Sequence, residues 1–178
     1  MKDILNYIKI KQGDITEENT DAIVNAANTS LLGGGGVDGA IHRAAGPQLL
    51  EECRGFGECR PGEARITKGY KLKAKHVIHT PGPIYKGGRS RERETLEHSY
   101  FNSMKLAKEY NLKSIAFPAI STGVYSYPKE EACEVAITTV INFIRDEDYV
   151  MDVNFVLFDK SNFDLYNNYI NRLNNELS

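Results

Sequence analysis

The chain has no tryptophan, only three cysteines and no long apolar segment. The odd number of cysteines prevents complete pairing into disulfides, so reduced thiols in a reducing compartment are expected. No stretch approaches the ~20 apolar residues that a membrane helix requires, and the first residues lack the apolar core of a secretory signal. We therefore expect a cytoplasmic protein without a membrane partner.

The chain also has no surplus of either charge. Lysine and arginine total 22, and aspartate and glutamate total 24, which gives a net charge of −2 with histidine neutral and a pI of about 6.1. A protein that binds DNA non-specifically normally carries a basic surplus, so no stable nucleic-acid partner is expected. Hydrophobic residues make up 41% of the chain, which is too apolar for a disordered protein.

The chain of 178 residues corresponds to about one domain. Because it shows no repeat, low-complexity tract or linker, residues 1–178 are predicted to form a single domain. Apolar runs typical of strands alternate with longer helical stretches. The predicted strands cover residues 4–12, 22–24, 64–67, 76–79, 114–117 and 153–158. The predicted helices cover residues 37–45, 48–54, 91–110, 129–145 and 161 to about 173, the last with Ser161 as its N-cap.

Strands separated by helices of this length predict βαβ units and an α/β protein with a largely parallel or mixed sheet. In such sheets, ligands bind at the carboxyl ends of the strands. The glycine-rich and polar runs of this chain fall in the loops that follow predicted strands. This coincidence is the first indication of function.

A run of four glycines separates a predicted strand from a predicted helix; it consists of Gly33, Gly34, Gly35 and Gly36. Backbone N–H groups without side chains can approach an anion closely, and the start of the following helix adds its positive dipole end. A flexible turn is the alternative interpretation. The run is neither a Walker A loop nor a dinucleotide fingerprint, because the Gly-Lys-Ser/Thr ending and the Gly-x-Gly-x-x-Gly spacing are both missing.

Polar side chains flank the glycine run on both sides. Asn25 and Asn28 precede it, and Asp38 follows it at the start of the predicted helix. An aspartate at a helix start can simply complement the helix dipole. Together, however, Asn28 and Asp38 offer an amide and a carboxylate to one cleft, where they could bind sugar hydroxyls and position a water.

Two further loops follow predicted strands. The loop after the strand at 114–117 suits a diphosphate cradle made of backbone N–H groups, although it could also be a plain surface connection; it contains Ser121, Thr122, Gly123, Val124 and Tyr125. A Ser-His-Asp hydrolase is disfavoured because Ser121 lacks the Gly-x-Ser-x-Gly context. After the first strand, Asp14 could accept a hydrogen bond from an exocyclic amine or could cap a turn.

The four histidines show no metal-ligand spacing. No His-Glu-x-x-His motif is present, and Cys53 and Cys59 have no partner pair. We therefore expect neither a metal site nor a cofactor.

Taken in order, the motifs resemble those of a macro domain of the MacroD type. They are GDIT at 13–16, DAIVNAAN at 21–28, GGGGVDGAIH at 33–42, PGEA at 61–64, HT at 79–80, GP at 82–83 and PAISTGVY at 118–125. The resemblance covers nearly the whole chain and is far more specific than any one glycine loop. Ser126 departs from it, because the family usually has glycine after the aromatic residue of this loop.

The resemblance implies a three-layer α/β/α sandwich with a mixed central sheet that binds ADP-ribose. It implies that Asp14 accepts from the adenine amine with help from the backbone of Ile15, and that Phe158 stacks on the adenine. Val37 and the four glycines would line the distal ribose and the diphosphate, and residues 121–125 would cradle the diphosphate. Asn25 is expected to contact the substrate as well.

The resemblance also implies an activity. Asn28 would bind the distal ribose, and Asp38 would steer or deprotonate a water held against the substrate phosphate. Such proteins remove mono-ADP-ribose from acidic side chains of proteins and deacetylate O-acetyl-ADP-ribose without a metal. Attack at the ester carbonyl and attack at the anomeric carbon both remain open. The alternatives are a non-catalytic ADP-ribose reader and an ADP-ribose 1″-phosphate phosphatase.

Overall fold

A computed structural model describes residues 2–177. Its centre is a sheet of six strands, and their order is β1-β6-β5-β2-β4-β3. The strands are β1 (Ile8–Gln12), β2 (Ala22–Ala26), β3 (Arg65–Lys68), β4 (His76–Thr80), β5 (Ser114–Phe117) and β6 (Asp152–Leu157). All neighbouring pairs are parallel except β3 and β4, which are antiparallel. The prediction of a mixed sheet is therefore confirmed, with the antiparallel strand at one edge.

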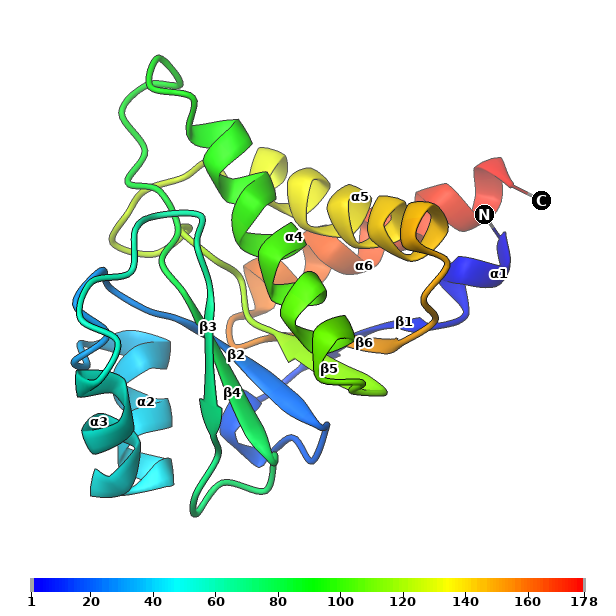
Figure 1. The fold of residues 1–178 in the computed structure, drawn as a ribbon. Coiled ribbons are helices and arrows are strands. Elements are labelled where there is room, and N and C mark those ends of the chain that lie inside the picture. Colours follow the sequence, from blue (N-terminus) through cyan, green and yellow to red (C-terminus); the bar gives the residue numbers. More distant parts are fainter. Residues whose placement is uncertain (1, 178) are drawn as a thin grey trace.

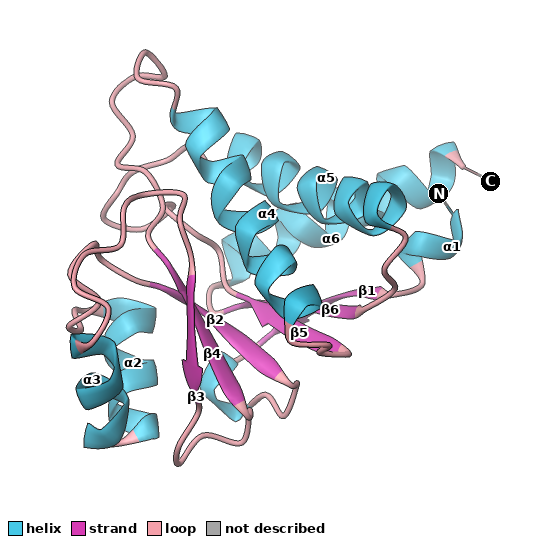
Figure 2. Ribbon diagram, in the orientation of Figure 1, coloured by secondary structure: helices cyan, strands magenta, loops and turns pink. Residues whose placement is uncertain are grey.

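Helices cover both faces of this sheet (Figures 1 and 2). The helices are α1 (Lys2–Leu5), α2 (Gly36–Ala45), α3 (Pro47–Arg54), α4 (Glu92–Glu109), α5 (Lys129–Glu147) and α6 (Lys160–Glu176), with a short 3-10 turn η1 (Ile15–Glu17). One face packs on α2 and α3, and the other packs on α4, α5 and α6. This arrangement is the expected three-layer α/β/α sandwich.

Each central strand contributes to both hydrophobic layers, because successive side chains of a strand point to opposite faces. In β2, Ile23 packs in the layer under α2 and α3, whereas Val24 packs in the layer under α4, α5 and α6. In β4, Val77 and Ile78 divide in the same way. These four side chains are fully buried, which explains why their strands appear in the sequence as continuous apolar runs.

Two details of the predicted elements are wrong. The first strand does not begin at residue 4 but at Ile8, because residues 2–5 form α1, which buries Leu5 against the core. The last helix is not capped by Ser161. It begins at Lys160, and the carboxylate of Asp159 accepts a hydrogen bond from the backbone N–H of Asn162. A carboxylate one turn before this N–H is the better cap, since it satisfies a free donor of the first turn.

The parallel strands bring their carboxyl ends to one edge of the sheet. The chain leaves β1, β2, β5 and β6 there, and the loops that follow these strands carry the residues singled out above. None of the helices within residues 2–177 is long and apolar enough to cross a membrane. The three cysteines are buried and have free thiols.

Candidate active site

Two cavities lie at this edge of the sheet, one of about 560 Å³ and the other of about 480 Å³. The larger is lined by the loop after β1, the first turns of α2 and the residues after β6. The smaller is lined by the loops that follow β2 and β5. Both cavities are lined by Gly36, Val37, Ala119 and Gly123. They are therefore the two ends of one cleft.

The larger cavity contains several predicted binding residues, namely Asp14, Ile15, Gly36, Val37, Thr122, Gly123 and Phe158. Asp14 caps η1, since its Oδ1 accepts from the backbone N–H of Thr16 at 2.9 Å and from the Thr16 hydroxyl at 2.7 Å. Both hydrogen bonds end on Oδ1, which leaves Oδ2 available. The ring of Phe158 is 81% exposed at the cavity wall, so one face is free to stack on a planar group.

The smaller cavity contains most of the remaining predicted residues, namely Asn28, Gly34, Gly35, Gly36, Val37, Asp38, Ser121, Gly123, Val124 and Tyr125. None of the N–H groups of residues 122–125 donates a backbone hydrogen bond within the described chain, although those of Ser126 and Tyr127 do. The loop is held in place by Tyr85, whose N–H donates to the Tyr125 carbonyl at 2.9 Å. Its free N–H groups suit the binding of an anion.

Backbone conformation explains the strain at one residue of this loop, and close packing explains a glycine beside it. Ser126 has a φ of 62°, a left-handed conformation in which glycine is the unstrained residue. A serine in place of the usual glycine is therefore strained at this position. Across the cleft edge, a Cβ at Gly82 would lie 2.2 Å from the Ser121 hydroxyl. Only glycine fits at that position.

Two predicted binding residues do not line either cavity. Gly33, the first glycine of the run, lines neither of them, and its carbonyl accepts a hydrogen bond from the Asn28 side chain. Asn25 is fully buried in β2, behind Asp38. The interpretation of Asn25 as a residue that touches the ligand therefore needs correction, because its alternation in the strand directs it into the protein rather than into the cleft.

Asp38 lies in the first turn of α2 and is only 4% exposed. Its Oδ1 accepts a hydrogen bond from Asn25 Nδ2 at 2.8 Å and lies 3.4 Å from His42 Nε2, one helical turn further on. Its Oδ2 is buried and has no hydrogen-bond partner among residues 2–177. Burial raises the pKa of the Asp38 carboxyl, and three contacts oppose this rise, namely the Asn25 hydrogen bond, the nearby His42 ring and a hydrogen bond from the backbone of Asn28.

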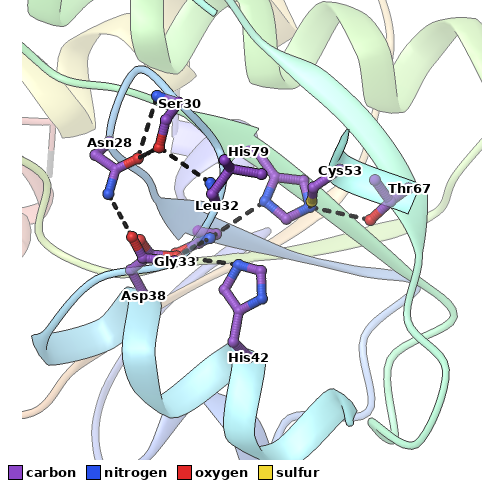
Figure 3. A network of polar contacts seen from close by, with 10 residues as sticks. Asn28, Ser30, Leu32, Gly33, Asp38, His42, Cys53, Thr67 and His79 are labelled. Carbon is purple, nitrogen blue, oxygen red and sulfur yellow. Dashed lines mark hydrogen bonds and ion pairs between the residues drawn. The ribbon is translucent and has the colours of Figure 1, made fainter. Parts of the chain in front are cut away.

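The side chains of Asn28 and Asp38 point toward one another (Figure 3), and both lie close to Gly34. A Cβ at Gly34 would lie 3.1 Å from Asp38 Oδ2 and 3.2 Å from Asn28 Nδ2. The Asn28 amide is itself fixed, because its Oδ1 accepts from the Ser30 hydroxyl at 2.6 Å and its Nδ2 donates to the Gly33 carbonyl. The glycine thus keeps open a space in which an amide and a carboxylate with a free oxygen meet.

The family of the chain follows from a match to a known family model. Residues 24–136 match the family model described as Macro domain. The chain belongs to the macro domain family.

Curated relatives of this macro domain cover most of the chain. It is 58% identical over 155 residues to a macro domain-containing protein of Chlorobaculum tepidum, covering 87% of this chain and 90% of that protein. It is 54% identical over 163 residues to a protein of Salmonella typhimurium named O-acetyl-ADP-ribose deacetylase, covering 89% of this chain and 91% of that protein.

Solved macrodomains have the same fold. A variant of the Oceanobacillus iheyensis macrodomain with ADPR superposes with a TM-score of 0.88 at 45% identity, over 93% of this chain and 92% of that one. The Trypanosoma brucei macrodomain in complex with ADP-ribose also gives a TM-score of 0.88, at 42% identity, over 94% of this chain and 70% of that one.

Two histidines of this macro domain belong to the polar network around Asp38: His42 lies beside the carboxylate, and His79 contacts it through Asn25. His42 could have been found from sequence, because a spacing of four residues places it on the same helix face as Asp38. His79 could not, because it comes from β4 and reaches Asn25 across the sheet. Within the described part of the chain, no group of three or more histidine, cysteine, aspartate or glutamate side chains could hold a metal ion.

Proposed function

We propose that this macro domain, acting as one domain over residues 1–178, is a cytoplasmic hydrolase of the MacroD type. It binds ADP-ribose, deacetylates O-acetyl-ADP-ribose and removes mono-ADP-ribose from acidic side chains of proteins. The observation that carries the proposal is the pair of Asn28 and Asp38. A buried carboxylate with a free oxygen faces a fixed amide at the end of a cleft, which a pure binding module does not need.

The two ends of the cleft suit the two ends of ADP-ribose. In the larger cavity, Asp14 Oδ2 would accept from the adenine amine beside the backbone of Ile15, while the exposed Phe158 ring stacks on the base. The diphosphate would lie between the start of α2 and the free N–H groups of residues 122–125. The distal ribose would then reach Asn28 in the smaller cavity.

This placement brings the scissile ester to Asp38. A water held between Asp38 Oδ2 and the substrate phosphate would attack while the carboxylate takes its proton. Cleavage of the ester C–O bond, with return of this proton to the leaving oxygen, would release the carboxylic acid and the ADP-ribose hydroxyl. Binding of the diphosphate and the distal ribose supplies the orientation for this step. For an ester on the anomeric carbon, attack at the ester carbonyl and attack at the anomeric carbon lead to the same products.

The proposal is tested by incubating the protein separately with three substrates and following the products by mass spectrometry. These are O-acetyl-ADP-ribose, a protein mono-ADP-ribosylated on glutamate or aspartate, and ADP-ribose 1″-phosphate. Turnover of the first two is expected, together with ADP-ribose binding in calorimetry. Binding without turnover would instead identify a reader, and release of phosphate from the third substrate alone would identify a phosphatase.

A further inference from the structure

We propose that His79 is a positioning residue for Asp38: its unprotonated Nδ1 sets the orientation of the Asn25 amide, which in turn orients the carboxylate. The inference rests on the proposed hydrolase function. His79 is fully buried, lines neither cavity and does not contact Asp38 directly. Its influence on the reaction therefore passes through one side chain, that of Asn25.

The sheet itself brings His79 and Asn25 together. They are register partners on the neighbouring parallel strands β4 and β2, so their side chains project to the same face. Asn25 Nδ2 lies 3.2 Å from His79 Nδ1 and 2.8 Å from Asp38 Oδ1. A side-chain amide nitrogen has two hydrogens, and here one goes to the histidine ring and the other to the carboxylate.

The histidine acceptor adds to the carboxylate in holding the Asn25 amide in one orientation. If the Asn25 amide turned over, its oxygen would face both Asp38 Oδ1 and His79 Nδ1, and three acceptors would meet without a hydrogen between them. In the observed orientation, both hydrogens are used, and the remaining Asn25 Oδ1 is buried without a partner in the described chain. The carboxylate and the ring nitrogen together therefore make this orientation the better one despite an unsatisfied carbonyl, and the ring nitrogen supplies the second of the two acceptors.

The other side of the ring fixes its tautomer. His79 Nε2 lies 3.0 Å from the Thr67 hydroxyl oxygen in β3. The same hydroxyl lies 3.1 Å from the Lys68 carbonyl, which can only accept, so the Thr67 proton points there. The Thr67 oxygen therefore accepts from His79 Nε2–H, and Nδ1 keeps its lone pair for Asn25.

The surroundings keep the ring neutral. Burial, together with the charge of His42 on α2, lowers the pKa of His79 to about 3. On α3, Cys53 lies 3.8 Å from Nε2, and burial raises the pKa of its thiol to about 11, so it carries no charge. Besides His42, α2 contributes Asp38 itself, the titratable side chain that contacts Asn25. A neutral ring retains the Nδ1 acceptor throughout the pH range of an assay.

Loss of the acceptor should be visible in the chemistry and not in ground-state binding. Without it only Asp38 holds the amide in this orientation, and the hydrogen bond that opposes the rise of the Asp38 pKa is weakened. We expect kcat to fall and the acidic limb of its pH profile to move to higher pH, since Asp38 must be ionised to accept a proton. KM should stay the same because neither His79 nor Asn25 lines the cleft.

Three variants separate this role from a structural one, with O-acetyl-ADP-ribose as the substrate. His79→Phe fills the space without an acceptor, and kcat should fall about 10–100-fold, the change expected when a hydrogen bond to a charged group is weakened or lost, with KM within about twofold. His79→Asn places its Oδ1 near the position of Nδ1 and should restore most of kcat. Cys53→Ala is the control: it removes a side chain that lies near His79 Nε2, away from Asn25, and should behave like the wild type.

A measurement on the wild-type protein does not depend on how the variants fold. Nitrogen-15 NMR of the His79 ring should report the Nε2–H tautomer, unchanged down to about pH 4. An Nδ1–H tautomer, or a His79→Phe variant with wild-type kcat and an unmoved acidic limb, would overturn the role of His79. An equal loss of kcat in Cys53→Ala would also overturn it. A wild-type protein without turnover would instead overturn the proposed hydrolase function.

Discussion

Replacement of Asp38 by asparagine tests the proposed chemistry with the least change in shape. The new amide oxygen can accept from Asn25 as Oδ1 does now, so the buried network behind the cleft persists. What disappears is the negative charge and the basic oxygen Oδ2, which is the group without a partner at the cleft. The Asp38→Asn variant therefore isolates the role of the carboxylate as a proton acceptor.

The expected magnitude follows from that role. Loss of a general base lowers kcat by about 10²–10⁴-fold, whereas ADP-ribose affinity should hold or improve, because a negative charge beside the diphosphate is removed. In the wild type, kcat should fall as the pH drops through a pKa that burial has raised above the ordinary aspartate range near ~3.9. The variant should show no such acidic limb.

Stability gives an independent check with a defined sign. Burial raises the pKa of Asp38 in the folded protein above its unfolded value, so the native state binds the proton more tightly. The ionised carboxylate therefore costs stability at neutral pH, and this cost disappears as the pH falls through the folded-state pKa. The Asp38→Asn variant has no such cost. Its Tm at pH 7 should equal or exceed that of the wild type, and the difference should shrink on acidification.

The assay measures Tm, ADP-ribose affinity and turnover on the same preparation of each variant. Asn28→Ala is the matched comparison, because its amide lines the same cavity and should contribute to both affinity and turnover. An Asp38→Asn variant that retains turnover within about fivefold of the wild type would refute the reasoning. So would a variant that is inactive only because it no longer binds ADP-ribose.

Three other substitutions test separate parts of the cleft. Gly34→Ala places a methyl group 3.1 Å from Asp38 Oδ2 and 3.2 Å from Asn28 Nδ2; turnover should fall at least about 10-fold because the attacking water loses its place, and normal turnover would show that the water lies elsewhere. Asp14→Ala should weaken ADP-ribose by roughly 1–3 kcal/mol but leave ribose 5-phosphate unaffected in calorimetry, and equal weakening of both would reduce Asp14 to a cap of η1. Phe158→Ala should weaken ADP-ribose by roughly 1–3 kcal/mol through lost stacking without lowering Tm, because the ring is 81% exposed; unchanged affinity would contradict adenine stacking.

Much of the fold could be predicted from local patterns. Apolar runs such as that at β5 have the bounds expected from sequence, Ser114–Phe117, because a buried strand is continuous in its hydrophobicity. The first strand was predicted too long, because the alternation of residues 4–12 is equally compatible with a short helix that buries Leu5. The order of the strands and the antiparallel edge were not predicted, since they depend on contacts between distant segments.

The candidate site divides in the same way. Which loops line the cleft could be predicted from the sequence, because glycine runs and polar side chains after strands are local features and Asp38 lies in the first turn of a helix directly after one of them. Tertiary structure alone decided which side chains reach the cleft. Asn25 and Asn28 are three residues apart, yet one is buried behind the carboxylate and the other lines the cavity. His79 meets Asn25 only because β2 and β4 pair in one register across 54 residues of chain, and such a pairing is a property of the assembled sheet.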